Sequence, residues 1–170
     1  NRFKIALVAA ALVTLYMVIT KMPVSLYSNL IPGGLLVAGF FGLSMLSSQD
    51  PNVVPHSKNV IAGVTFAFGT AMTAHVYRFE YDIYDMLVSR EFVCFSVLCV
   101  LNISAIDLWE HAARTQDLEV KSSDELTLTL PLALLAGASL LYALMDSEQA
   151  SRPFFYAILT GAALLHVLNR

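Results

Sequence analysis

Six apolar stretches, separated by short polar connectors, dominate this sequence of 170 residues. A bilayer core about 30 Å thick takes about 20 apolar residues in a helix, and fewer where polar ends or neighbouring helices help. The stretches cover residues 3–20, 26–46, 60–77, 92–108, 126–145 and 154–168. Because backbone groups in lipid must be hydrogen-bonded within their own segment, the pattern predicts an all-α membrane protein. We expect about six transmembrane helices in one domain, residues 1–170.

The composition agrees with a membrane protein. Hydrophobic residues make up 57% of the chain and charged residues 14%, whereas soluble domains have about 45–50% and about 25%. The net charge of −3 leaves no basic surface that could follow a phosphate backbone, which argues against nucleic acid as a partner. The lipid bilayer is the partner that the composition favours.

The basic residues predict an orientation. Six spans put both termini on one side of the membrane, which we name side A. Side A then holds Arg2, Lys4, Lys58, Arg114, Lys121 and Arg170, and the opposite side holds Lys21, Arg78, Arg90 and Arg152. Because basic residues concentrate in cytoplasmic loops, both termini and the 109–125 loop are expected to be cytoplasmic.

Several small features indicate packing rather than chemistry. Small residues spaced four apart predict close helix contacts, at Ala38/Gly42, Gly63/Ala67/Ala71, Ala133/Gly137 and Ala157/Gly161. Cys94 and Cys99 are five residues apart, so on a helix their side chains diverge by about 140°, which favours two buried thiols over a disulfide. Pro32 and Pro131 predict helix kinks or helix starts.

The end of the fourth stretch carries the strongest candidate for chemistry. Asp107, Glu110 and His111 stand at i, i+3 and i+4, and therefore share a helix face. Asn102 lies about one and a half turns deeper, at membrane depth. Mg²⁺ uses one or two carboxylates and completes its shell with water and phosphate oxygens, so Asp107 and Glu110 are candidate metal ligands. The alternative, an ordinary charged helix end at a membrane surface, stays open.

Polar residues also open the third stretch on side A. Lys58 and Asn59 could direct donors at an anion near a helix N-terminus. A lysine that extends its ammonium to the membrane interface is the alternative.

The four histidines do not predict a haem site. His75 and His166 are expected near opposite membrane surfaces, so they cannot bind one haem in a simple bundle. His56, His111 and His166 share side A, which permits a metal site, although no metal-binding spacing supports one.

Two segments resemble a known family. Lys58-Asn59 followed by Phe66-Ala67-Phe68-Gly69-Thr70, and then Asn102 with Ile106-Asp107-Leu108-Trp109-Glu110, are similar to segments of the UbiA-type prenyltransferase superfamily, especially its divergent bacterial members. The resemblance implies a fold of nine helices around a lipid-facing cavity, with these six stretches as the third to eighth helices. It also implies a bacterial inner membrane location and Mg²⁺-dependent transfer of an isoprenyl group from its diphosphate to an aromatic or lipid acceptor.

The resemblance assigns roles to the same polar residues. Asp107 and Glu110 would hold Mg²⁺, Asn102 would line the pocket below, and Lys58 and Asn59 would contact the diphosphate. The acidic motif reads Asp107-x-x-Glu110, which departs from the family's Asp-x-x-x-Asp. The family's first acidic motif would precede Asn1 and its last helix would follow Arg170. We therefore expect either an internal portion of a longer enzyme or a reduced relative that does not catalyse.

A different class of function is compatible with the same sequence. A non-catalytic scaffold subunit of a larger photosynthetic or respiratory membrane complex would also have low charge and small-residue helix faces. Its partners would be other membrane subunits, and it would need no cofactor.

Overall fold

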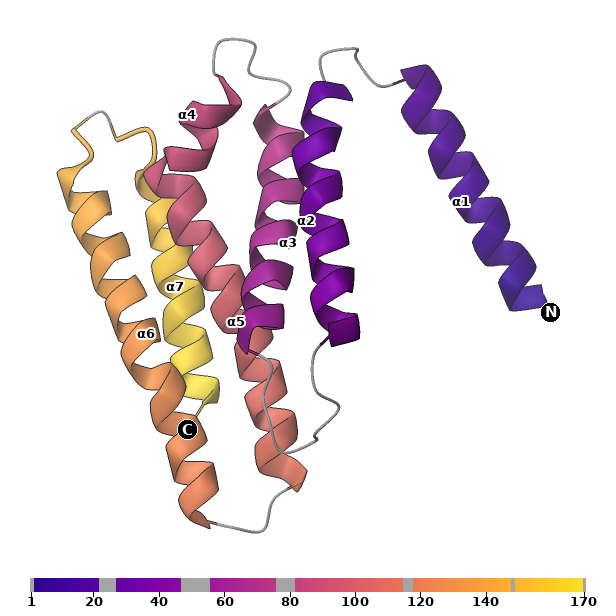
Figure 1. The fold of residues 1–170 in the computed structure, drawn as a ribbon. Coiled ribbons are helices and arrows are strands. Elements are labelled where there is room, and N and C mark those ends of the chain that lie inside the picture. The colour runs from indigo at the N-terminus through magenta and orange to yellow at the C-terminus, as the bar shows by residue number, and fades with distance from the viewer. Residues whose placement is uncertain are drawn as a thin grey trace.

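The computed structural model describes residues 2–21, 27–46, 56–75, 82–114, 118–147 and 149–169, and every regular element in these ranges is a helix. The helices are α1 (Arg2–Lys21), α2 (Tyr27–Leu46), α3 (His56–His75), α4 (Ile83–Val88), α5 (Arg90–Arg114), α6 (Leu118–Met145) and α7 (Arg152–Leu168). Figure 1 shows α2 to α7 as a bundle of roughly parallel and antiparallel rods, with α1 standing apart. The all-helical prediction is confirmed.

Most of the long helices extend beyond the apolar stretches that predicted them. α5 continues to Arg114 and α6 already begins at Leu118, so most of the predicted 109–125 connector is helical. Apolar residues mark only the part of a helix suited to lipid, whereas Glu, Ala, Arg and Lys continue a helix well in water. Pro32 and Pro131 lie inside α2 and α6, so neither marks a helix start. Asn1, Arg170 and the predicted span residues 26, 76 and 77 lie outside the described residues.

The short helix α4 was not predicted, and it lies within the expected polar connector between the third and fourth apolar stretches, residues 78–91. It ends at Ser89, whose backbone is extended, with φ −65° and ψ 145°. The Ser89 hydroxyl donates to the Met86 carbonyl at 2.7 Å and accepts from the Phe92 N–H at 3.1 Å. The second bond is an N-cap, which satisfies a donor that the first turn of a helix leaves unpaired, so Ser89 fixes where α5 begins.

The main core lies between α5, α6 and α7. Each helix contributes buried side chains to one cluster: Cys94, Leu101, Ala105 and Leu108; Leu128, Leu132, Leu135 and Ala143; Phe155, Ile158, Ala162 and Leu165. A second layer forms where α3 packs on α5 and α2 packs on α3. Both cysteines are buried and free, as predicted.

The small-residue pattern is confirmed where α3 meets α5. A Cβ atom at Gly63 would lie 2.6 Å from both the Cα and the N of Val100, and Ala67 is fully buried. Such an approach is possible only without a side chain at residue 63. The predicted Ala133/Gly137 pair is instead exposed, and a Cβ at Gly137 would meet nothing within 4 Å.

Two helical segments in the described residues are long and apolar enough to cross a membrane, Arg90–Arg114 and Leu126–Met145. Only 33% and 28% of their most apolar windows are buried, whereas an apolar core helix of a soluble protein is mostly buried. Shorter apolar segments lie in α1, α2 and α7. α1 makes no extended contact with the other described helices, and its large apolar side chains are exposed, among them Leu12, Leu15, Tyr16 and Ile19.

Candidate functional site

The contact between Gly63 and Val100 sets the relative height of α3 and α5. The two helices run antiparallel (Figure 1), so the first turn of α3 lies beside the later turns of α5. His56 is seven residues before Gly63 and Asp107 is seven residues after Val100. Since each helical residue rises about 1.5 Å, His56 and Asp107 lie at about the same height.

Asp107 lies on the side of α5 that faces α3. Val100, Ile103 and Asp107 are spaced i, i+3 and i+7, which places them on one stripe of the helix, and Val100 is the residue in contact with Gly63. The Asp107 side chain is half-buried. The fold therefore brings this carboxylate to the end of the bundle where α3 begins.

Glu110 stands one turn further along α5 and is more open to solvent. Its Oε2 atom accepts a hydrogen bond from Arg114 Nη2 at 2.9 Å, and the two side chains are 60% and 68% exposed. Exposed i, i+4 ion pairs contribute only about 0.3–0.5 kcal/mol. The arginine therefore restrains this carboxylate weakly, and Glu110 can exchange it for another cation at small cost.

Asn102 is not brought together with the two acids in the described chain. Five residues separate Asn102 from Asp107, so the side chains point about 140° apart on α5. Asn102 is exposed, whereas Asp107 is half-buried towards α3. The spacing of five residues by itself predicts this separation.

The first turn of α3 holds the other two predicted binding residues. Lys58 is half-buried, and its Nζ atom lies 5.9 Å from the centroid of the Phe40 ring on α2, within the range of a cation–π contact. Asn59 is buried, with a relative exposure of 2%. Its Nδ2 atom has no hydrogen-bond partner in the described structure. Sequence reasoning identified Asn59 as a donor but could not detect that it is buried.

The histidines do not gather into a metal site. Among the described residues, no group of three or more His, Cys, Asp or Glu side chains lies close enough to hold a metal ion. The predicted alternative of a site at His56, His111 and His166 is therefore wrong. His75 ends α3 and His166 lies in the last turn of α7, at opposite ends of the bundle (Figure 1), as predicted.

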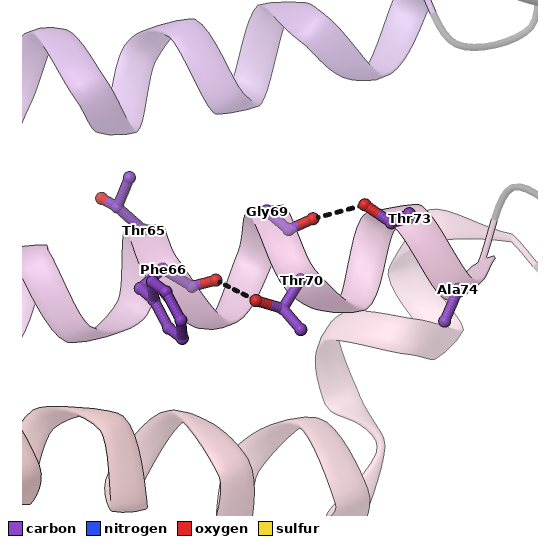
Figure 2. A pocket seen from close by; sticks show the side chains of 6 residues that line it. All are labelled: Thr65, Phe66, Gly69, Thr70, Thr73 and Ala74. Atoms are coloured by element: carbon purple, nitrogen blue, oxygen red, sulfur yellow. Dashed lines mark hydrogen bonds between the residues drawn. The ribbon is translucent and has the colours of Figure 1, made fainter.

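A groove of about 760 Å³ lies along one helix. Figure 2 shows its six lining residues, all from α3: Thr65, Phe66, Gly69, Thr70, Thr73 and Ala74. The Thr70 hydroxyl donates to the Phe66 carbonyl at 2.9 Å, and the Thr73 hydroxyl donates to the Gly69 carbonyl at 3.0 Å. These two hydroxyl protons are used within α3 itself, whereas the buried Thr65 hydroxyl has no hydrogen-bond partner among the described residues.

A second pocket was not predicted from the sequence. It has a volume of about 400 Å³ and lies between α2, α3, α4 and the start of α5. The described residues that line it are all apolar: Pro32, Leu35, Leu36, Gly39, Ile61, Val64, Phe68, Leu87 and Phe92. No sequence pattern reveals it, because its walls come from four separate helices.

Comparison with known proteins adds no family to this description: no family model matches the chain, and no curated protein or solved structure matches it.

Proposed function

We propose that this chain is a UbiA-like intramembrane prenyltransferase, or the portion of one that carries the second acidic motif. It would bind an isoprenyl diphosphate with Mg²⁺ where α3 begins and α5 ends. The observation that carries the proposal is Asn59, whose buried Nδ2 has no hydrogen-bond partner among the described residues. An unpaired buried donor costs about 1–3 kcal/mol, which is understandable if a ligand accepts its hydrogen bond.

The surroundings of Asn59 suit an anion. The first turn of α3 carries unpaired backbone donors and the positive end of the helix dipole, which favour phosphate. Lys58 precedes Asn59 and supplies a full positive charge. We propose that Lys58 and Asn59 bind the diphosphate, and that Asn102 contacts another part of the substrates or a neighbouring helix.

The donor set at the end of α5 fits Mg²⁺. Asp107 and Glu110 offer two carboxylates at i, i+3, and Mg²⁺ needs one or two of these when phosphate oxygens and water complete its shell. Glu110 is held only by its exposed pair with Arg114. Bound there, Mg²⁺ would neutralise charge on the diphosphate leaving group. Lys58 would neutralise charge on the same group directly, and the apolar helices would exclude water from the allylic carbon.

The exposed apolar helices support the proposed membrane location. In α5 and α6, most of the segment that is apolar enough to span a membrane is exposed. Such exposure is favourable only in contact with lipid or with other apolar helices. We propose six spans in a bacterial inner membrane, with the termini and the region of residues 109–125 cytoplasmic. The acceptor would be a hydrophobic aromatic compound or a lipid that reaches the site from the bilayer.

One observation favours the scaffold alternative. α1 makes no extended contact with the other described helices and exposes large apolar side chains. A helix of this kind would suit a chain whose main role is to hold other membrane subunits. Such a subunit would not bind an isoprenyl diphosphate.

The test is Mg²⁺-dependent binding of an isoprenyl diphosphate to the purified protein in lipid nanodiscs. We expect the wild type to bind farnesyl diphosphate with Mg²⁺ and to lose binding when EDTA is added. Asp107→Ala should abolish binding and Glu110→Ala should weaken it, whereas Asp85→Ala, an exposed acid on α4, should have no effect. Equal binding by wild type and Asp107→Ala would overturn the site, and no binding by wild type would favour the scaffold role.

A further inference from the structure

We infer that four charged side chains, at the end of the bundle opposite to Asp107, bind the headgroup of a zwitterionic phospholipid that carries a phosphate and a primary ammonium. The four residues come from the start of α5, the end of α6 and the start of α7: Arg90, Glu91, Asp146 and Arg152. Figure 1 shows these three helix ends at the same end of the bundle. The inference goes beyond the proposed function and does not use the diphosphate site.

Ser151 brings the two carboxylates together. Its hydroxyl donates to Glu91 Oε1 at 2.6 Å, and its backbone N–H donates to Asp146 Oδ2 at 2.9 Å. Each carboxylate therefore uses one oxygen for Ser151. Among the described residues, no donor is bonded to the second oxygen of either carboxylate. Two carboxylate oxygens close to each other are thus left for a donor from outside the chain.

The two arginines lie beside the carboxylates without pairing with them. Arg152 Nε donates to the backbone carbonyl of Asp146 at 3.1 Å. The Arg90 guanidinium carbon lies 5.3 Å from the centroid of the Tyr142 ring, within cation–π range. Within the described ranges, neither guanidinium forms an ion pair with a carboxylate. The terminal Nη groups are therefore available, and a phosphate accepts from such groups in a bidentate manner.

The balance of charge favours a zwitterionic ligand. Glu91, Asp146 and Arg152 are half-buried, and charges withdrawn from water are normally paired. Two positive and two negative groups that do not pair with each other match a ligand that has both charges. Its phosphate would accept from the arginines, and its ammonium would donate to the carboxylates. A purely anionic headgroup would face two negative charges, and a choline headgroup has no N–H to donate.

A layer of aromatic rings next to these charges favours a lipid over a soluble phosphate ester. Neighbouring ring centroids are 5.5, 5.8 and 6.4 Å apart along the series Tyr142, Phe155, Phe154 and Phe95. Tyr142 is four residues before Asp146, so it lies about 6 Å deeper along α6. Aromatic belts of this kind lie at the level of lipid headgroups. The four charges are therefore at the depth where a phosphate and an ammonium of the bilayer are found.

The experiment is native mass spectrometry of the purified protein in detergent, titrated separately with phosphatidylethanolamine, phosphatidylglycerol and phosphatidylcholine that have the same acyl chains. The wild type should bind phosphatidylethanolamine about fivefold or more tightly than either of the other two lipids. Arg90→Gln and Arg152→Gln should each weaken this binding by about tenfold, because a hydrogen bond to a charged group is lost. Lys21→Gln removes the same charge at an exposed position of α1 and should bind as the wild type does.

Glu91→Gln tests the contact with the ammonium separately. Glutamine keeps an oxygen that can accept from the Ser151 hydroxyl but removes the negative charge. The variant should therefore lose the preference for phosphatidylethanolamine over phosphatidylglycerol, while it still binds the phosphate. Circular dichroism of each variant confirms that the helices are formed.

Three results would overturn the inference. Equal binding of the three lipids by the wild type would show general contact with lipid only. Unchanged phosphatidylethanolamine binding by both arginine variants, or an unchanged preference in Glu91→Gln, would place the headgroup elsewhere. Competition by free phosphoethanolamine as strong as that by the lipid would assign these residues to a soluble phosphate ester instead.

Discussion

Gly63 of α3 lies against the main chain of Val100 of α5, so closely that a Cβ atom on the glycine would be 2.6 Å from the Val100 Cα. The contact joins the second layer of the bundle to its main core. It also sets the height at which Asp107 stands beside the first turn of α3. The geometry of the candidate site therefore depends on a residue that has no side chain.

Replacing Gly63 by alanine should destabilise the protein. The added methyl group would meet backbone atoms, which cannot move without shifting a helix, and overpacking of this kind costs about 1–3 kcal/mol. The measurement is unfolding by increasing mole fractions of sodium dodecyl sulfate in mixed micelles, followed by circular dichroism.

Gly69→Ala on the same helix is the control for Gly63→Ala. A Cβ at Gly69 would meet nothing within 4 Å, and alanine is a better helix former than glycine by about 0.5–1 kcal/mol. We therefore expect Gly69→Ala to be neutral or slightly stabilising. Similar effects of the two substitutions would mean that α3 and α5 do not approach each other this closely.

The hydrogen bond between Trp109 and Asn169 should contribute to docking of α7 on α5. Trp109 Nε1 donates to Asn169 Oδ1 at 3.2 Å, and Asn169 is buried. Asn169→Ala leaves the indole N–H without this acceptor, so we expect a loss of about 0.5–1.5 kcal/mol in the free energy of unfolding. Because Trp109 is the only tryptophan, its fluorescence can follow the unfolding directly.

Asn169→Asp retains an oxygen acceptor and is the matched variant for that measurement. It should lose less stability than Asn169→Ala. The backbone N–H of residue 169, which donates to the Leu165 carbonyl at 3.0 Å, is unaffected in both variants. Equal losses in the two variants would assign the effect to the helix end rather than to the indole.

The sequence predicts the helices of this protein better than it predicts the site. Apolar runs identify each long helix because a run of this length in lipid must hydrogen-bond its backbone groups within its own segment, and a helix does so. They do not identify α4, whose six residues are too few for a period to be visible. The apolar runs also end before α5 does and begin after α6 does, because polar residues extend both helices.

The candidate site needs information that only tertiary structure supplies. Asn59 stands at the start of a helix, where a polar residue is normally solvated, and its burial depends on how α3 packs. The pocket beside Gly39 depends on four helices meeting. The separation of Asn102 from Asp107, in contrast, follows from their spacing of five residues, and it could have been predicted.

The hydrogen bonds of Ser151 should stabilise the connection between α6 and α7. Its hydroxyl donates to Glu91 Oε1 at 2.6 Å, and its backbone N–H donates to Asp146 Oδ2 at 2.9 Å. Hydrogen bonds to charged groups contribute about 1.5–3 kcal/mol, so Ser151→Ala should lower the free energy of unfolding by an amount in this range. The comparison is Ser147→Ala, at an exposed position in the same loop, for which we expect less than about 0.5 kcal/mol. Equal effects would show that the bond to Glu91 contributes nothing.

Replacing Asn59 distinguishes a binding role from a structural role, because the two roles predict opposite changes in the free energy of unfolding. In the part of the chain that the structure describes, its buried Nδ2 has no hydrogen-bond partner, and leucine has a similar size without a polar group to desolvate. Asn59→Leu should therefore keep or raise the free energy of unfolding, by up to about 1–3 kcal/mol, while it weakens Mg²⁺-dependent diphosphate binding. The same substitution at the exposed Asn102 should change stability by less than about 0.5 kcal/mol. If the substitution stabilises the free protein but weakens binding, Asn59 has a role in ligand binding rather than in stability. If Asn59→Leu instead destabilises the protein as an ordinary core lesion would, the amide serves the packing of α3 and its role in diphosphate binding is refuted.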